Sequence, residues 1–365
     1  MINESLSKNN VVRNWLLIGM VMVFIQVIVG GITRLTESGL SITKWEVVSG
    51  TLPPMSEPDW ITEFELYKTT PQYTEVNEGM TMSDFKFIYF WEYIHRFWAR
   101  IMGFVFLFPF LYFYFVGMIS RPLLRRLGLV VLLAILAATF GWIMVASGLI
   151  QRPWVNAYKL SLHLCIAMSV FVALFWAYLH EGYGNMYKSL TASRGVKTLL
   201  PWVMSILILQ LFLGGVMSGM RAAVVFPTWP DMNGIFVPSI IFDPSQWSSS
   251  NFNNYDQNEF MPALIHFMHR TIAYVLFGLG ILFAYRIYDS HNSNVVTNSS
   301  RKSLTGTRIA YVIVTLLFLQ VVLGIITVVS SQGSVPVLWG VLHQAGALLL
   351  LSSFVVSIFV LEVKN

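Results

Sequence analysis

The stretch Val337–Val360, VLWGVLHQAGALLLLSSFVVSIFV, is an apolar run that contains no Asp, Glu, Lys or Arg. An α-helix of this length, rising about 1.5 Å per residue, crosses a hydrocarbon core of roughly 30 Å. A soluble fold has no use for so long an uncharged helix, so we interpret it as a transmembrane span. Its one ionisable side chain, His343, is costly in lipid and is therefore a candidate functional residue.

Similar runs recur along the whole 365-residue chain, which is 56% hydrophobic and only 11% charged, against about 25% charged in soluble domains. Together they predict an all-α polytopic membrane protein with eight transmembrane helices. The predicted spans are about 15–31, 88–117, 128–150, 157–179, 199–220, 261–285, 309–329 and 337–360. The first is read as a retained helix and not a signal peptide, because no small-residue cleavage site follows it.

The distribution of basic residues predicts the orientation. With a cytoplasmic N-terminus, thirteen Lys and Arg residues fall in cytoplasmic segments and seven in the longer outer loops, and three lie within spans. The positive-inside rule then places both termini in the cytoplasm. No transit peptide precedes the first span, which favours a bacterial inner membrane. The net charge is +5, but the basic residues form no continuous arm, so nucleic acid is not an expected partner. The single cysteine, Cys165, is interpreted as a packing residue.

The chain repeats itself with offsets of 184, 174 and 180 residues. The matching pairs are Gln26-x3-Gly30-Gly31 with Gln210-x3-Gly214-Gly215, Glu92-x2-His95-Arg96 with His266-x2-His269-Arg270, and His163 with His343. We therefore predict two tandem four-helix bundles related by a pseudo-two-fold axis along the membrane normal. The N-terminal half is residues 1–190 with the outer loop 32–87. The C-terminal half is 191–365 with the outer loop 221–260.

Four histidines lie at matching depths, roughly 9–12 Å below the outer ends of their predicted helices. They are His95, His163, His269 and His343. A lone intramembrane histidine is often a plain interhelical hydrogen-bonding residue, but four in one layer, two per half, favour ligation. Zinc prefers three or four ligands, frequently with cysteine or carboxylate. Haem iron needs only one or two axial ligands, so haem is the better fit.

Other residues near the histidines fit a haem site without requiring one. Arg96, Arg100 and Arg270 are candidate partners of haem propionates, although each could instead reach the membrane interface. Small residues could leave room for a flat macrocycle or serve close helix packing; they are Gly103, Gly141, Gly148, Gly278, Gly324 and Gly346.

The repeated His-Arg motif differs between the two halves at the position three residues before the histidine. Glu92 stands three residues before His95, on the same helix face, and its counterpart in the second half is His266. A buried carboxyl near a haem could move protons or orient water, or it could simply pair with His95 or Arg96. His266 could support a ligand or replace it; His269 is preferred as the ligand because it aligns with His95.

The first outer loop carries a long and specific string. It comprises residues 30–41 (GGITRLTESGLS), Trp45, Gly50, Pro53, Pro54, Trp60, Phe64, Tyr67, Pro71, Tyr73, Asn77, Met80, Phe85, Lys86 and Glu92-x2-His95-Arg96. With these motifs the chain strongly resembles the haem A synthases, in the class found in mitochondria and many Gram-negative bacteria. The resemblance runs from about residue 14 to 360.

The resemblance implies an oxidoreductase that oxidises the C8 methyl of haem O to a formyl group, making haem A for cytochrome oxidase. Carried over by position, His95 and His163 would ligate the substrate haem, and His269 and His343 a haem B that passes electrons. Glu92 would be the catalytic acid or base. The chain lacks the cysteine pair of the Gram-positive branch, which excludes a thiol relay, and many relatives have Gln where His266 stands.

The resemblance also implies partners. A haem O synthase would supply the substrate, a redox partner would accept the electrons, and lipid would surround the helices; a homo-oligomer stays open. The main alternative is a di-haem membrane electron carrier of the cytochrome b type, which explains the four histidines but not the difference between Glu92 and His266. A haem transporter is a third class, with sites that release haem.

Overall fold

The computed structural model describes residues 2–44, 52–183, 194–292 and 300–361. Trp45, Gly50 and the predicted division at 190/191 lie outside them. Eight helices are long and apolar enough to cross a membrane, and the described residues form no β-strand, so the prediction of an all-α polytopic protein is confirmed. The eight are α1 (Ile2–Leu35), α4 (Met82–Phe115), α5 (Arg121–Gln151), α6 (Ala157–Tyr183), α7 (Arg194–Gly219), α10 (Phe260–Asn292), α11 (Ser300–Val329) and α12 (Val337–Leu361).

Several helices extend beyond the predicted spans. The clearest case is α4, which begins at Met82 and not near Ile88. Thr81 caps this helix through a reciprocal capping box, in which its hydroxyl accepts from the Asp84 amide and the Asp84 carboxylate accepts from the Thr81 amide. Such a box satisfies amides that the first turn would otherwise leave bare. Capping therefore lets α4 start outside the apolar run that hydropathy detects.

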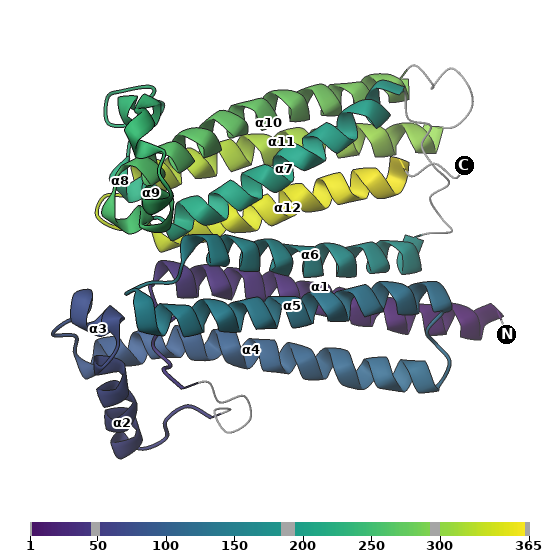
Figure 1. Cartoon of the computed structure of the whole chain (residues 1–365). Helices are drawn as coiled ribbons and strands as arrows, with labels where there is room; N and C mark the ends of the chain where they lie inside the picture. The colour runs from purple at the N-terminus through teal and green to yellow at the C-terminus, as the bar shows by residue number, and fades with distance from the viewer. Residues whose placement is uncertain (1, 45–51, 184–193, 293–299, 362–365) are drawn as a thin grey trace. The chain divides into compact units, whose positions relative to one another are not determined.

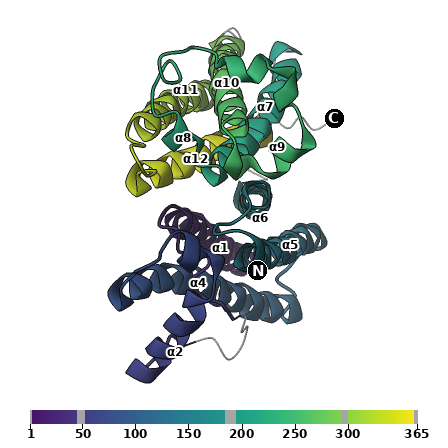
Figure 2. The ribbon, with the colours of Figure 1, turned by 60° about the vertical axis from the view of Figure 1, so that its left-hand side comes forward.

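The chain forms two compact units, Met1–Leu174 and Phe175–Asn365, and α6 begins in the first and ends in the second. In the first unit, α1 and α4 run side by side in opposite directions (Figure 1, Figure 2). Indole N–H groups tie the pair together: Trp15 donates to the carbonyl of Val105 at 3.0 Å, and Trp98 donates to that of Met22 at 2.9 Å. These bonds fix the register that brings His95 on α4 opposite α1.

In the second unit, α10 packs between α7 and α11, and α12 packs along α11 (Figure 2). Aromatic residues contribute to this core, as in the contact of Phe283 with Phe354 at 5.6 Å between ring centres. His269 therefore lies on α10 beside α7, and His343 lies on α12 beside α11.

The outer segment of the first unit contains two helices that the sequence patterns did not predict, α2 (Glu57–Lys68) and α3 (Pro71–Glu75). Their charged side chains face outward, while a cluster of buried aromatic and aliphatic residues fastens them to the start of α4. The cluster consists of Phe64, Tyr67, Phe85, Ile88 and Tyr89. Aromatic packing of this kind contributes about 0.5–1.5 kcal/mol per ring pair beyond area burial, so the segment is a folded cap on α4.

Tyr67 joins the parts of this cap. Its hydroxyl donates to Gln72 Oε1 at 3.1 Å and accepts from Asn77 Nδ2 at 2.7 Å. Gln72 in turn donates to the carbonyl of Glu37 at 2.9 Å, which links the cap to the end of α1. Burial raises the pKa of Tyr67 to about 12, from an ordinary value of 10.0.

A spectroscopic titration tests this burial. Because the folded state binds the Tyr67 proton more tightly than the unfolded chain, its contribution to stability is present below pH 10 and is lost as the pH rises towards 12. We expect the tyrosinate absorbance that disappears in Tyr67→Phe to titrate near pH 12. A component that titrates near pH 10 would show that the phenol is solvated and that the cap is not packed on α4.

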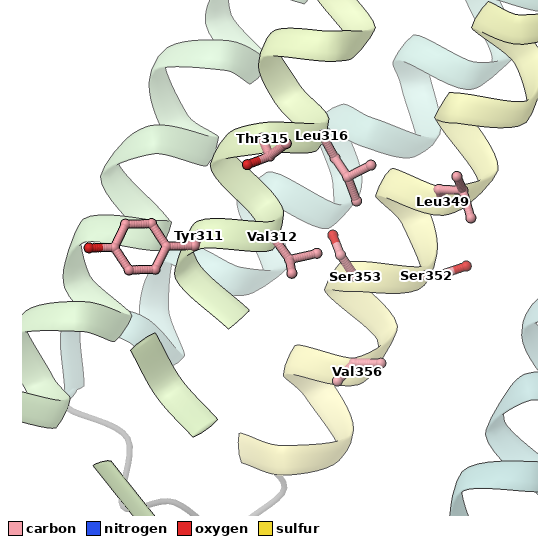
Figure 3. Close-up of a pocket in the computed structure, with 8 residues that line it drawn as sticks. All are labelled: Tyr311, Val312, Thr315, Leu316, Leu349, Ser352, Ser353 and Val356. Carbon is pink, nitrogen blue, oxygen red and sulfur yellow. The ribbon is translucent and has the colours of Figure 1, made fainter. Parts of the chain in front are cut away.

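A groove of about 490 Å³ lies between α11 and α12 (Figure 3). It is lined by Tyr311, Val312, Thr315, Leu316, Leu349, Ser352, Ser353 and Val356. The hydroxyls of Ser352 and Ser353 bond to the carbonyls of Leu348 and Leu350 in their own helix, so the walls are largely apolar. The groove contains none of the predicted ligands and suits an apolar chain better than a polar ligand.

Candidate haem-binding site

His95 lies on α4 and faces α1. The amide nitrogen of Gln26 is 3.1 Å from the carbonyl of His95, and 3.3 and 3.4 Å from its two ring nitrogens. A Cβ built on Gly30 would lie 3.1 Å from the Cε1 atom of the ring. Such a distance is tighter than ordinary contact, so glycine at position 30 is what allows the imidazole to sit against α1.

His163 lies on α6 and faces α5 in the same way. A Cβ on Gly141 would again be 3.1 Å from the imidazole Cε1. The Nδ1 atom is 2.9 Å from the carbonyl oxygen of Ala137. Because a carbonyl can only accept, Nδ1 carries the proton and Nε2 is left with its lone pair. A histidine in this tautomer can ligate a metal through Nε2.

The second unit repeats the arrangement twice. His269 on α10 packs its Cε1 against Gly214 of α7, and its Nε2 is 3.2 Å from the amide nitrogen of Gln210. His343 on α12 packs against Gly324 of α11 in the same manner. In both cases the Cβ of any larger residue would lie 3.1 Å from the ring. All four predicted histidines therefore share one local geometry, an imidazole edge against a glycine of the neighbouring helix.

His269 and His343 approach each other. Their ring centres are 6.5 Å apart and their planes are inclined at 79°. A metal bound by two imidazoles, each through a bond of about 2 Å, separates the ring centres by roughly 6 Å. The pair is therefore spaced to hold one iron from two sides, and the structure brings these two predicted ligands together. His95 and His163 also lie close enough to interact electrostatically.

Two further observations fit a haem between such pairs. All four histidines are only partly buried, although their helices are long and apolar, so a part of each remains accessible to a ligand. The rings of His269 and His343 hydrogen-bond the backbone of Gln210 and Gln320, as the ring of His163 hydrogen-bonds that of Ala137. A backbone acceptor of this kind orients a metal-bound histidine.

Glu92 lies one turn from His95 and is only 2% exposed. Its Oε1 accepts from Arg96 at 2.5 Å. Its Oε2 accepts from the Ser41 hydroxyl at 2.7 Å and from the backbone N–H of Ile42 at 2.8 Å. The carboxylate thus joins α4 to the chain just after α1, which is the structural role that the sequence left open. To accept a further proton it would have to share or release one of these bonds.

Comparison with known proteins now decides the family. Residues 13–355 match the family described as cytochrome oxidase assembly protein. The chain is 37% identical over 342 residues to a protein named "Heme A synthase" from Sinorhizobium fredii, which covers 93% of this chain and 87% of the relative. The proteins of that name from a Bradyrhizobium species and from Nitrosospira multiformis are also 37% identical, over 93% of this chain and 88% and 90% of theirs.

The chain belongs to the haem A synthase family. The resemblance carried by the string that begins at Gly30 is thereby confirmed. Residues of that string also hold the outer segment together: Ser41, with the neighbouring Ile42, binds the Glu92 carboxylate, and Tyr67 joins the parts of the cap.

The arginines predicted to meet propionates are engaged with outer-segment backbone. Arg96 bonds Glu92 and lies 3.4 Å from the carbonyl of Ile42. Arg270 donates to the carbonyls of Pro230 at 2.6 Å and Phe236 at 2.5 Å. Its Nε finds no partner among the described residues, so one N–H remains for an anion. The propionate role of these two residues, and of Arg100 one turn after Arg96, stays a prediction.

His266 is directed away from a ligand role. It is 2% exposed, its ring lies against that of Phe226 at 6.3 Å, and it hydrogen-bonds the backbone of Ala222. These contacts connect α10 to the outer segment of the second unit. The preference for His269 over His266 therefore agrees with the contacts that each ring makes, and His266 occupies the anchoring place that Glu92 has in the first unit.

The glycines that the sequence singled out differ from one another. Gly141 and Gly324 face imidazoles, Gly148 faces Leu40, Gly346 faces Gln320, and Gly103 and Gly278 have no atom within 4 Å of a built Cβ. The sequence noted Gly30 and Gly214 only as parts of a repeat, although they face His95 and His269. Their position one helical turn after Gln26 and Gln210, repeated in both halves, is the sequence feature from which this packing role could have been predicted.

A matched pair of substitutions tests the imidazole–glycine packing. Gly214→Val would force the His269 ring away from α7, and we expect the haem B bound per chain to fall at least tenfold, because misplacing a support of a metal ligand costs on the order of 10–100-fold in affinity. Gly278→Val adds the same group to α10 where nothing is near. Pigment per purified chain is the measurement. Equal haem content in the two variants would contradict the packing described for His269.

Proposed function

We propose that this chain is an oxidoreductase that converts haem O to haem A by oxidising the C8 methyl to a formyl group. Membership of the haem A synthase family supports the overall reaction. The observation that carries the proposal is the pairing of His269 with His343, and of His95 with His163, on helices of the same unit. Each unit thereby offers two axial ligands for one haem, which is what a substrate haem and a second haem require.

The reaction removes electrons as well as protons. With water as the oxygen source, the methyl and one water give the formyl group, four protons and four electrons. A methyl on a macrocycle has no acceptor of its own, so the site needs an electron sink. His269 and His343 would hold a haem B, which can accept single electrons when bound. Electrons would then leave to a redox partner in or at the membrane.

The first unit is the proposed substrate site because it alone has an acid beside its ligand. Glu92 could accept the protons released at the methyl group, and Arg96 forms an ion pair with it. In the second unit His266 stands in that place and is held by Phe226 and Ala222. The unequal pair therefore supports a reaction site in one unit and an electron site in the other.

The membrane setting follows from the basic residues. We propose a bacterial inner membrane with both termini in the cytoplasm, so that the cap formed by α2 and α3 lies on the outer face. The apolar farnesyl tail of haem O would lie among the helices or against lipid. A haem O synthase in the same membrane would deliver the substrate.

Expression in a bacterial host that makes haem O but has no haem A synthase tests the proposal. Extraction and chromatography of total haem should show haem A only when the wild-type chain is present. His95→Ala and His163→Ala should leave haem O unconverted. If the wild-type chain is folded and carries haem but produces no haem A, the chain would instead be a di-haem electron carrier.

A further inference from the structure

A lysine lies one helical turn before His163 on α6. Lys159 precedes the histidine by four residues, so the two side chains share a face of the helix, and Lys159 lies about 6 Å nearer the helix start. The Oδ1 atom of Asn156 accepts from the backbone N–H groups of Tyr158 and Lys159, at 3.1 and 3.2 Å, and so satisfies amides of the first turn. The place of Lys159 beside His163 is therefore set by a regular helix.

Among the described residues, the ammonium group of Lys159 has no anionic partner. Its side chain is half-buried, and it takes part in no ion pair and no side-chain hydrogen bond within that part of the chain. A cation at the end of an apolar span is costly unless it reaches water or meets an anion. Lys159 therefore has a full charge available on the face of α6 that carries His163.

The counterpart of Lys159 in the second unit carries no charge. With the offset of 180 residues that relates His163 to His343, Lys159 corresponds to Trp339. An ammonium group binds anions through its charge and three N–H donors, whereas an indole offers one neutral N–H. As with Glu92, a charged side chain beside a predicted ligand is thus replaced by an uncharged one in the other unit.

The arginine that follows the ligand on α4 or α10 is engaged differently in the two units. Arg96 forms an ion pair with Glu92, so its charge is already balanced by a carboxylate. Arg270 donates to two backbone carbonyls, and no carboxylate of the described residues forms an ion pair with it. The second unit therefore offers an anion the charge of Arg270, and in the first unit Lys159 offers a charge that no carboxylate balances.

Haem O carries two propionate carboxylates on one edge of its macrocycle. Carboxylates are costly to bury without a partner, so this edge belongs near the water-facing end of the helices. The start of α6 lies at the same end of the first unit as α2 and α3, and Lys159 is nearer that end than His163 (Figure 1). We propose that Lys159 binds a propionate of the haem held between His95 and His163. The inference rests on the substrate site put forward under the proposed function and goes beyond it by naming a residue that recognises the substrate.

Binding of haem O and of its dimethyl ester to the purified full-length chain tests the inference. The ester lacks the propionate charges but keeps the iron, the macrocycle and the farnesyl tail. The chain is purified from a host that makes haem B and no haem O, and binding to the first unit is followed by the low-spin absorbance that is lost in His163→Ala. In Lys159→Met we expect the Kd for haem O to rise roughly tenfold and the Kd for the ester to stay unchanged, because only the charged propionate loses a partner.

Two control variants accompany Lys159→Met, with haem B per chain as the check on folding. Lys159→Arg keeps a cation with N–H donors and should bring the Kd for haem O to within about threefold of wild type. Lys86→Met removes the same charge from the outer end of α4, where Lys86 is exposed and lies 5.1 Å from the centre of the Trp60 ring. This variant should leave both Kd values unchanged.

Three results would overturn the inference. Equal weakening of haem O and its ester in Lys159→Met would show that the lysine only packs the helix. Unchanged binding of both would show that it only extends to the membrane interface. A weakening by Lys86→Met as large as that by Lys159→Met would show a general effect of charge and not a contact with propionate.

The binding experiment also separates this inference from the proposed function. If haem A forms in the expressing host but Lys159→Met binds haem O as tightly as wild type, the inference fails alone. If haem O and its ester behave as described but no haem A forms, Lys159 is a propionate-binding residue and the proposed reaction fails. A first unit that binds neither haem O nor its ester would overturn both.

Discussion

Alanine at His269 or His343 is expected to remove haem B from the second unit. The two rings, 6.5 Å apart, are placed to hold one iron from both sides, so each variant leaves a single axial ligand. Changing a residue that merely supports a ligand costs on the order of 10–100-fold in metal affinity, and losing the ligand itself should cost at least as much. Haem B per chain should therefore fall at least tenfold, with loss of the low-spin spectrum.

The informative control is His266→Ala. His266 is the nearest other histidine, one turn from His269, and it is buried against Phe226. We expect this variant to keep its haem B and its low-spin spectrum, with a cost confined to thermal stability. If His266→Ala lost haem while His269→Ala retained it, the ligand assignment in the second unit would have to be exchanged.

Glutamine at Glu92 is expected to stop haem O conversion while leaving haem B in place. General acid–base catalysis typically contributes 10²–10⁴-fold, so conversion should fall by roughly that factor if the carboxylate handles the released protons. The measurement is the ratio of haem A to haem O in the expressing host, together with haem B per purified chain. Conversion at the normal rate in Glu92→Gln would remove the proposed role.

Glu92 also has a structural duty that must be separated from that role. Breaking a buried ion pair can destabilise by about 3–5 kcal/mol, and Glu92 pairs with Arg96. Ser41→Ala removes one hydrogen bond to the carboxylate but keeps its charge and the pair. We expect Ser41→Ala to lower conversion less than Glu92→Gln does, because the carboxylate and its ion pair remain; the lost hydrogen bond costs roughly 1–3 kcal/mol of stability at a buried site. A loss equal to that in Glu92→Gln, at unchanged melting temperature, would make Glu92 an anchor of the outer segment.

The eight spans could be predicted because a bilayer imposes a length that apolar runs reveal directly. The span 337–360, for example, appears as helix Val337–Leu361. The start of α4 at Met82 could not be read from hydropathy, because the capping box of Thr81 and Asp84 adds polar turns outside the apolar run. The helices α2 and α3 were missed for a related reason: they are held by tertiary packing of Phe64 and Tyr67 on α4, and not by periodicity of their own.

The candidate site was predicted in its ligands but not in their supports. The four ligands could be predicted because an ionisable residue within a transmembrane helix is costly and therefore indicates a functional site. They are His95, His163, His269 and His343. Their glycine partners and the glutamines Gln26, Gln210 and Gln320 lie 19 to 69 residues away in sequence, and only Gln26 and Gln210 belong to a recognisable Gln-x3-Gly-Gly motif. Gln320 is followed by a single glycine and Ala137 breaks the pattern, so the fourfold relation emerges only from contacts.

The central claim is that one chain holds two different haems, one of them its substrate. Extraction of pigment from the purified full-length protein, with haem types separated and counted per chain, tests it most directly. We expect haem B together with haem O or haem A, and we expect His269→Ala to lose the haem B selectively. Haem B alone at two per chain would contradict a substrate haem in the first unit and would identify an electron carrier with two equivalent sites.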